Sequence, residues 1–458
     1  MAIPARRLET SRNPACLSEK SSFFAEKRVR IPGPFHQGVG TSHAERGLER
    51  RMEMNNGRPL SGYRVVELCT FAAGPTCARL MADWGADVIK VEPPDGDPMR
   101  AFGATMAMPV QQDECPAWEL YNANKRAIVL DLKTAAGQGV LHKLLETVDV
   151  FITSYRPQAL RKLKIDYDSL RERYPRLVYA FLSGFGEKGP DVGRPGFDIT
   201  AFWTRSGFAV DLVKPNEYPV YPPAGFGDTS TGSTLVAGVC AALLQRGKTG
   251  KGEKISISLY GTAVWFSGLL ITSTQDRYKN KFPKHRYEAT PNVTYYRSKD
   301  GDWVIISILE YERYFPGLAK AVGREDLIND PRFNTSAQMV KYKGELVRAL
   351  EDAFAAKTTE ELLKNLTEAD IVHDLMPHFK DVITDEQALA NNMVHDFTFA
   401  NGAKVVLPHT PLKFAGSGEL PYERGPLLGE HTREVLSELG YSANQIQELT
   451  SEKNTMAK

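Results

Sequence analysis

One carboxylate stands out in the stretch Pro222–Arg246, where glycines and hydroxyl residues surround Asp228 and an apolar helical pattern follows it. An aspartate at such a place is a common helix N-cap, because its side chain accepts a hydrogen bond from the first turn. The same place would keep the carboxylate ionised through backbone N–H groups and the helix dipole. Gly225 and Gly227 would let a bulky ligand approach the backbone closely. The pattern alone leaves both interpretations open.

The elements that must position this segment alternate between short β-branched runs and amphipathic helices. We expect strands at 63–68, 86–91, 127–130, 148–152 and 177–182, with helices at 75–85, 134–147 and 158–162. Strand, helix and strand in close succession indicate parallel pairs with right-handed crossovers. The sequence therefore predicts a doubly wound α/β domain, in which ligands bind at the carboxyl ends of the strands.

The loops at these strand ends argue against several kinds of site. One G-x-G-x-x-G match occurs at Gly184, Gly186 and Gly189, but prolines follow where a helix should open. A nicotinamide cofactor is therefore disfavoured, and the sequence contains no phosphate-binding P-loop pattern after these strands. We expect no metal site, because neither H-E-x-x-H nor paired cysteines occur.

Composition narrows the class of protein further. The 458 residues carry a net charge of +1, with 42% hydrophobic and 25% charged residues. Nucleic-acid binders usually carry a basic excess, so we expect no nucleic-acid partner. We also expect no membrane span, because no apolar run approaches about 18 residues. The five cysteines are widely separated, which is typical of a cytoplasmic enzyme in a reducing compartment.

The charge is unevenly distributed. Residues 1–53 hold ten basic and six acidic residues, a net charge of +4, so the remaining 405 residues carry −3. The segment 1–58 lacks a sustained period and is broken by prolines, so we interpret it as a disordered basic extension. It could also be a targeting segment, a functional arm, or an artefact preceding a true start at Met52 or Met54.

Seven segments in order resemble the class III CoA-transferases (the CaiB/BaiF family), which also include formyl-CoA transferase and α-methylacyl-CoA racemase. The resemblance covers nearly all of residues 59–440. The segments are PLSGYRVVELCTFAAGPTCARLMADWGADVIKVEPPDGDPMR (59–100), NANKRAIVLDLK (122–133), SYRPQALRKL (154–163), LSGFGEKGP (182–190), GDTSTG (227–232), GKGEKISISL (250–259) and PLLGEHT (426–432).

The resemblance implies a particular α/β architecture. A Rossmann-like large domain at 59–285 would be completed by both chain ends, with 397–458 returning to it. A small α/β domain would be inserted at 286–396. Family members form dimers of interlocked rings, so we expect an obligate homodimer.

The resemblance also implies a reaction. Its nucleophile would be the Asp of the G-D motif, here Asp228, which strengthens the catalytic interpretation over capping. A carboxylate nucleophile would form an aspartyl anhydride and then an aspartyl-CoA thioester. The partners would be an acyl-CoA and a small organic acid. Coenzyme A would enter as a thioester substrate, with no permanently bound cofactor.

The CoA contacts follow from matching motifs in the family. They are expected at Ala72, Ala73, Leu130, Lys133, Ser154, Tyr155, Arg156 and Lys162. Lys133 and Lys162 could instead be solvated lysines beside helices. Lys90 and Arg100 lie on the signature and are candidates for the CoA phosphates, although salt bridges at the strand ends fit them equally well.

Departures from the family pattern bear on the alternatives. Pro93 and Ala72 stand where an Arg and a Gln are common, and a Gly-rich flap is missing, so formyl or oxalate specificity is not expected. The racemase branch uses a His before Asp198, but this sequence has Phe197, which cannot move a proton. Glu310 lies where racemases also carry an acid. Asp198 could be an acid beside Asp228 or a hydrogen-bonded structural residue.

The segments 196–212 and 221–228 look most like the branch that acts on 2-hydroxy acids such as 2-hydroxyisocaproate and phenyllactate in amino-acid fermentation. Phe202, Trp203, Phe208 and Tyr221 would then line an apolar acyl pocket, or belong to the core. We expect a CoA-transferase. An acyl-CoA racemase or epimerase is the alternative, and a non-catalytic CoA-binding scaffold is a third possibility that the intact G-D motif disfavours.

Overall fold

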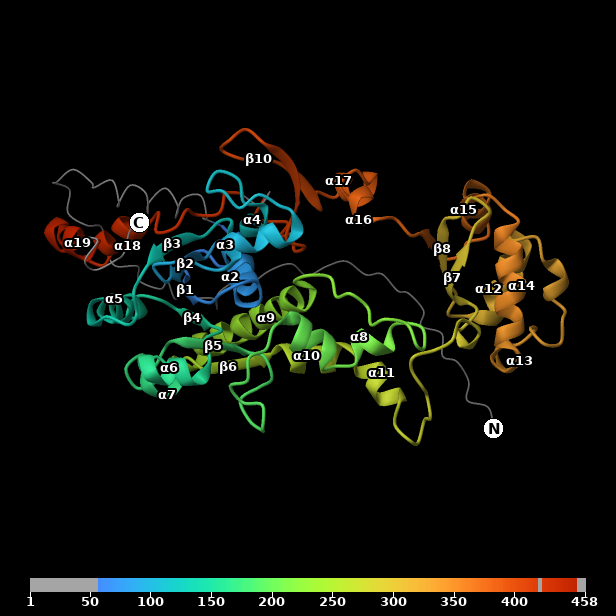
Figure 1. The fold of residues 1–458 in the computed structure, drawn as a ribbon, viewed down its shortest axis with the longest axis horizontal. Coiled ribbons are helices and arrows are strands. Elements are labelled where there is room, and N and C mark those ends of the chain that lie inside the picture. Colours follow the sequence, from blue (N-terminus) through green and yellow to red (C-terminus); the bar gives the residue numbers. More distant parts are fainter. Residues whose placement is uncertain (1–56, 419–421, 451–458) are drawn as a thin grey trace, which may run out of the picture. The chain divides into compact units, whose positions relative to one another are not determined.

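The computed structural model describes residues 57–418 and 422–450 (Figure 1). Residues 1–56 of the predicted extension 1–58, including the alternative starts at Met52 and Met54, lie outside the described residues. None of the helices in the described ranges is both long and apolar enough to span a bilayer.

A six-stranded parallel sheet organises the described chain, with the strand order β3-β2-β1-β4-β5-β6. The strands are β1 (Arg64–Leu68), β2 (Asp87–Glu92), β3 (Arg126–Val129), β4 (Val150–Thr153), β5 (Val178–Ser183) and β6 (Lys254–Ser258). This order is that of a doubly wound dinucleotide-binding fold, with a switch point between β1 and β4. The predicted α/β class is therefore confirmed.

Helices cover both faces of the sheet because alternate strand residues point to opposite sides. Val65 belongs to one core and Val66 to the other. The first core also contains residues of α2 (Ala73–Asp83), α9 (Phe226–Thr249) and α10 (Leu259–Phe266). The second contains residues of α5 (Ala135–Leu145), α6 (Pro157–Leu163), α7 (Tyr167–Leu170), α18 (Thr432–Glu438) and α19 (Ala443–Leu449). Residues of the C-terminal segment therefore belong to a core of the main sheet.

Local signals set several of these boundaries. The side chain of Thr134 accepts a 3.0 Å hydrogen bond from the N–H of Gly137 and so caps α5. Pro75 lies in the first turn of α2, where its missing N–H leaves no helical bond unmade. The helix nevertheless begins two residues earlier than the sequence predicts, at Ala73.

A separate core lies between residues 296 and 371. Its antiparallel sheet has the strand order β7-β8-β9, and helices pack against it. The elements from this part of the chain onward are β7 (Val293–Arg297), β8 (Trp303–Ser307), α12 (Tyr311–Ala321), α13 (Ser336–Lys341), α14 (Lys343–Ala355), α15 (Thr359–Glu368), β9 (His373–Leu375), α16 (Phe379–Val382), α17 (Glu386–Ala390), β10 (Val394–Thr398) and β11 (Lys404–Pro408). The hairpin of β10 and β11 crosses the expected boundary at residues 396 and 397.

Short helices complete the loops at the carboxyl edge of the parallel sheet and beyond. They are α3 (Met99–Phe102), α4 (Pro116–Asn122), a π-helical turn (Asp198–Thr204), α8 (Phe208–Asp211) and α11 (Gly268–Ser273). None of them was expected from the sequence. Two of them, α4 and the π-helical turn, carry side chains that meet the start of α9.

A cluster of buried charged residues fixes the loop between β1 and α2. The Lys90 ammonium lies 2.7 Å from Glu67 and 2.8 Å from Asp97, and the Lys125 ammonium lies 2.7 Å from the other oxygen of Glu67. Asp97 also accepts a 3.0 Å hydrogen bond from the N–H of Phe71. Buried charges are tolerated only when they are paired in this way. The cluster therefore anchors the loop between β1 and α2 to the sheet.

Candidate active site

Asp228 is the third residue of α9. Gly225 occupies the N-cap position with φ at 75°, and no side-chain cap hydrogen bond is made there. The sequence-based alternative, in which Asp228 caps its own helix, is therefore wrong. Its side chain is available for another role in the first turn, where the positive end of the helix dipole lies.

Asp198 caps α9 from the π-helical turn instead. Its Oδ1 accepts a 3.1 Å hydrogen bond from the N–H of Gly227, and the side chain is 5% exposed. A Cβ placed on Gly227 would lie 2.3 Å from that oxygen and 2.4 Å from the ring of Phe202. Asp198 and Phe202 thus lie too close to Gly227, the glycine of the G-D motif, for any side chain at this position. The structural interpretation of Asp198 is confirmed, and the contact also holds Asp228 beside it.

Burial disfavours charge on both carboxyl groups. Loss of hydration raises the pKa of Asp228 to about 7, and the neighbouring Asp198 adds to the shift. Burial likewise raises the pKa of Asp198 to about 6, although backbone N–H groups of Gly225, Gly227 and Asp228 oppose the shift. Two interacting carboxyl groups in a poorly hydrated place share their protons. A reactive carboxylate with reduced hydration is a stronger nucleophile than a solvated one.

Tyr121 of α4 lies against the same helix start. A Cβ placed on Gly225 would lie 2.5 Å from the Tyr121 hydroxyl oxygen. The Thr229 side chain also interacts with this hydroxyl, and the charges of Asp228 and Asp198 act on it together with burial to raise its pKa. The head of α9 therefore presents two carboxyl groups and two hydroxyl groups.

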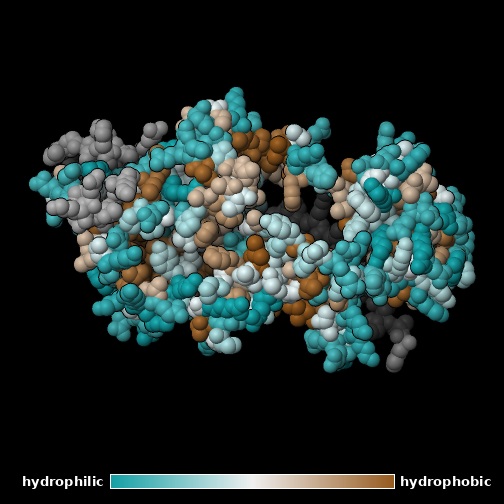
Figure 2. Space-filling view, viewed as in Figure 1, coloured by the Kyte–Doolittle hydropathy of each residue, from teal (hydrophilic) through white to brown (hydrophobic). Residues whose placement is uncertain are grey.

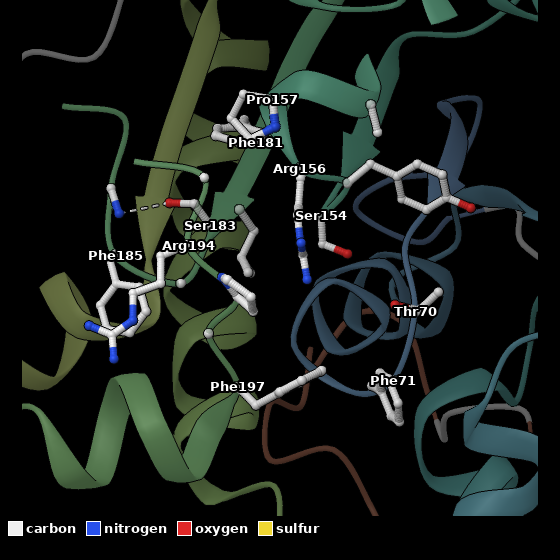
Figure 3. Close-up of a pocket in the computed structure, with 18 residues that line it drawn as sticks. Thr70, Phe71, Ser154, Arg156, Pro157, Phe181, Ser183, Phe185, Arg194 and Phe197 are labelled. Carbon is white, nitrogen blue, oxygen red and sulfur yellow. Dashed lines mark hydrogen bonds between the residues drawn. The ribbon is translucent and has the colours of Figure 1, made fainter. Parts of the chain in front are cut away.

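A cavity of about 320 Å³ opens beside the carboxyl ends of β1, β4 and β5 (Figure 3). Ser154, Tyr155 and Arg156 line it, together with Phe71 of the first loop. Phe71 meets Phe197 edge to face at 5.5 Å, and Phe197 directly precedes Asp198 in the chain. Three of the residues expected to contact CoA therefore share one cavity, next to the segment that positions Asp228.

The remaining residues expected to contact CoA differ in their solvent exposure. Ala72, Ala73 and Leu130 are buried residues, and their contacts with CoA stay predictions. Lys133 and Lys162 are exposed near the carboxyl ends of β3 and β4, and they remain predictions for the CoA phosphates.

Two expected phosphate contacts need correction. Lys90 is completely buried between Glu67 and Asp97, so its ammonium cannot reach a phosphate. Arg100 donates to both oxygens of Glu92, at 2.9 and 2.7 Å, and stacks on the ring of Trp118 at 3.6 Å. The salt-bridge alternative therefore describes both residues.

The four aromatic residues considered for an acyl pocket divide between the core and the surface. Phe202 and Trp203 are buried in the core between the sheet and α9, while Tyr221 is 90% exposed. Phe208 packs against that core at its edge. Glu310 precedes α12 on the surface and pairs with Arg313 at 3.3 Å. Instead, the exposed aromatic rings nearest the two carboxyl groups in the sequence are Phe197 and Phe226.

Sequence reasoning missed two features of this site. The capping role of Asp198 depends on a contact across 29 positions, and no local signal marks it. Tyr121 lies on a helix of seven residues, too short for a clear period. Pro116 at the first position of α4 was the available signal, because proline favours a helix start.

The profile of CoA-transferase family III matches residues 60–432. The chain belongs to this family. The family III chain is 39% identical over 388 residues to (R)-2-hydroxy-4-methylpentanoate CoA-transferase of Clostridioides difficile, covering 84% of this chain and 97% of that protein. It is 37% identical over 410 residues to cinnamoyl-CoA:phenyllactate CoA-transferase of Clostridium sporogenes, covering 88% and 99%.

A solved structure resembles the family III fold described above. A CaiB/BaiF family protein from Brucella suis superposes with a TM-score of 0.70 at 30% identity, covering 84% of this chain and 100% of that chain. The predicted family and the predicted enzyme class, a CoA-transferase, are thus confirmed. Within the described residues, no group of His, Cys, Asp and Glu is arranged to hold a metal ion.

The coupled carboxyl groups predict a pH dependence. With Asp228 as the nucleophile that the sequence predicts, the donor step requires its ionised form, so the rate should rise with pH through a pKa of about 7. Asp198→Asn removes the neighbouring charge and should move this rising limb to lower pH. Single-turnover kinetics across pH would measure it, with Asp191→Asn as the control. An unmoved limb in Asp198→Asn would contradict the coupling.

Proposed function

We propose that this protein transfers CoA from an acyl-CoA donor to a small carboxylic acid, with Asp228 as the covalent nucleophile. The observation that supports the proposal is the placement of Asp228 in the first turn of α9, partly buried and beside a second carboxyl group. A carboxylate activated by loss of hydration suits nucleophilic attack on a thioester.

The donor half of the proposed reaction begins when an oxygen of Asp228 attacks the thioester carbonyl carbon. The bond between that carbon and sulfur breaks, which gives a mixed anhydride and CoA thiolate. The thiolate then attacks the aspartyl carbonyl carbon. The donor acid leaves with the bridging oxygen, and Asp228 becomes an aspartyl-CoA thioester.

The acceptor half reverses these steps with a new acid. The acceptor carboxylate attacks the aspartyl carbonyl carbon and expels CoA thiolate, forming a second anhydride. The thiolate attacks the acceptor carbonyl carbon, and Asp228 leaves as a free carboxylate. Each step exchanges one activated acyl bond for another, so no nucleotide hydrolysis is needed. Backbone N–H groups at the start of α9 would stabilise the oxyanions.

We propose 2-hydroxy acids as the acceptors. The support is the similarity, over most of the chain, to relatives named for 2-hydroxy-4-methylpentanoate and for phenyllactate. The donor would then be an enoyl-CoA or an arylacrylyl-CoA, and the reaction would serve amino-acid fermentation in the cytoplasm. The replacement of an imidazole by Phe197 disfavours the racemase alternative, because no second proton-transfer group stands there.

We propose that CoA lies across the carboxyl edge of the sheet. The pantetheine arm would occupy the cavity lined by Ser154, Tyr155 and Arg156. Lys133 and Lys162 would meet the phosphates, because both are exposed and follow the carboxyl ends of β3 and β4. Coenzyme A enters and leaves as a substrate, so we propose no permanently bound cofactor.

We also propose three domains near 59–285, 286–396 and 397–458, with the last boundary displaced from the hairpin of β10 and β11 that it would cut, and an obligate homodimer. Two observations support them. Residues between 296 and 371 have their own core. Large apolar side chains are exposed on each of α9, α10 and α11, namely Leu244 at 72%, Trp265 at 78% and Leu269 at 89% exposure. Figure 2 shows apolar surface in the region of α10 and α11. An apolar surface of this kind usually marks an interface.

The nucleophile can be tested by trapping. Incubation with an acyl-CoA and hydroxylamine should give a hydroxamate or CoA adduct on the peptide that contains Asp228, detected by mass spectrometry. Asp228→Ala should lose the adduct and reduce turnover by at least about 10³-fold, because the covalent step is gone. The exposed Asp168 provides the control, and Asp168→Ala should keep both.

Two outcomes would contradict the proposal. Full transferase turnover in Asp228→Ala would exclude the covalent mechanism. Exchange of the substrate α-hydrogen with deuterated solvent, without any acceptor acid, would support the racemase alternative instead.

The dimer can be tested at its proposed apolar surface. Leu269→Arg should convert the protein to monomers and abolish turnover, because a charge on a buried apolar interface is strongly unfavourable. Light scattering after size-exclusion chromatography measures the mass. Val340→Arg, on α13 and 62% exposed, is the matched control. A monomeric wild-type enzyme with full activity would refute the proposal.

A further inference from the structure

The head of α9 contains two neutral hydroxyl groups that the proposed covalent steps do not use. Tyr121 reaches it from α4, and Thr229 follows the proposed nucleophile directly. The N–H of Thr229 donates a 2.8 Å hydrogen bond to the carbonyl of Gly225, which fixes its backbone in the first helical turn. The backbone of Thr229 is therefore fixed beside Asp228, and its exposed side chain interacts with the Tyr121 hydroxyl.

The position of the Tyr121 hydroxyl is fixed by packing. It lies so close to Gly225 that a Cβ there would be only 2.5 Å away. The ring packs against the cluster of Ala72, Met99, Ala117 and Trp118, so α4 holds the phenol from behind. A half-buried phenol that is held in this way has few rotamers, and its hydroxyl is pre-organised for a ligand.

The chemistry of the acceptor gives these hydroxyl groups a use. The acceptor carboxylate must approach the aspartyl carbonyl of Asp228, and a 2-hydroxyl group lies one carbon away from that carboxylate. A side chain that forms a hydrogen bond with this 2-hydroxyl group must therefore lie beside Asp228. At this stage Asp228 is a neutral thioester. An anionic group in contact with the acceptor would repel its carboxylate, whereas a hydroxyl group both donates and accepts without charge.

We propose that Tyr121, with Thr229, binds the 2-hydroxyl group of the acceptor and so determines the preference for 2-hydroxy acids. This inference rests on the proposed CoA-transferase function and names the residues that select its substrate class. Tyr121 would contact substrate only in the acceptor half of the reaction. A donor without a 2-hydroxyl group would not use this contact.

The test compares two acceptors that differ by one hydroxyl group, (R)-2-hydroxy-4-methylpentanoate and 4-methylpentanoate, with the same acyl-CoA donor. Wild-type protein should prefer the hydroxy acid in kcat/KM. Tyr121→Phe should lower kcat/KM for the hydroxy acid by about tenfold to hundredfold, because a desolvated hydroxyl group loses its partner. For 4-methylpentanoate the change should stay within about threefold.

Matched variants separate this role from a structural one. Thr229→Val should also reduce the preference, whereas Thr229→Ser, which keeps the hydroxyl group, should retain it. Tyr167→Phe, which removes a half-buried phenol far along the chain on α7, should leave the preference unchanged. Formation of the aspartyl-CoA adduct from the donor alone should be the same in Tyr121→Phe as in wild type.

The outcomes distinguish the inference from the function it rests on. Equal losses for both acceptors in Tyr121→Phe would overturn the inference, since Tyr121 would then act on the aspartyl group itself, and the CoA-transferase function would stand. An unchanged ratio of kcat/KM for the two acceptors in Tyr121→Phe would also overturn the inference and leave the CoA-transferase function standing. Failure of wild-type protein to form any aspartyl-CoA adduct or to use either acid would overturn both.

Discussion

The hydrogen bond from the N–H of Gly227 to Asp198 is the contact on which the rest of the site depends. It brings a buried carboxyl group to the positive end of α9 and leaves no room for a side chain at Gly227. The next residue, Asp228, is thereby held in a place of low hydration beside another acid. Burial of two acids is unfavourable by itself, and the backbone N–H groups of the helix start partly offset it.

The packing of the domain supports this arrangement. The α9 helix crosses α2 so closely that a Cβ on Gly232 would lie 2.3 Å from the carbonyl oxygen of Ala73. The loop that precedes α2 is held to the sheet through Phe71, Asp97 and Lys90. The buried ion cluster therefore positions the loop beside the cavity. Lys90 and Asp97 of the segment 59–100 thus have a structural role that requires no contact with the ligand.

Much of the fold could be predicted from the sequence because its signals are local. The β-branched run at Tyr63–Leu68 and Pro75 mark the first crossover, and Thr134 marks the start of α5. The partners of Lys90 could not be predicted, since Glu67 comes from a neighbouring strand and Asp97 from a loop. The position of Asp228 in the third place of its helix, and the aromatic residues that belong to the core, likewise depend on tertiary contacts that spacing does not reveal.

The central claim is that an oxygen of Asp228 forms a bond to the acyl group. Turnover with an acceptor acid labelled with oxygen-18 in its carboxylate tests it most directly. The bridging oxygen of the second anhydride comes from the acceptor and remains with the enzyme when the acyl group leaves. Mass spectrometry should therefore find oxygen-18 in the peptide containing Asp228, and in no other carboxyl group. A full turnover that leaves this peptide unlabelled would contradict the account.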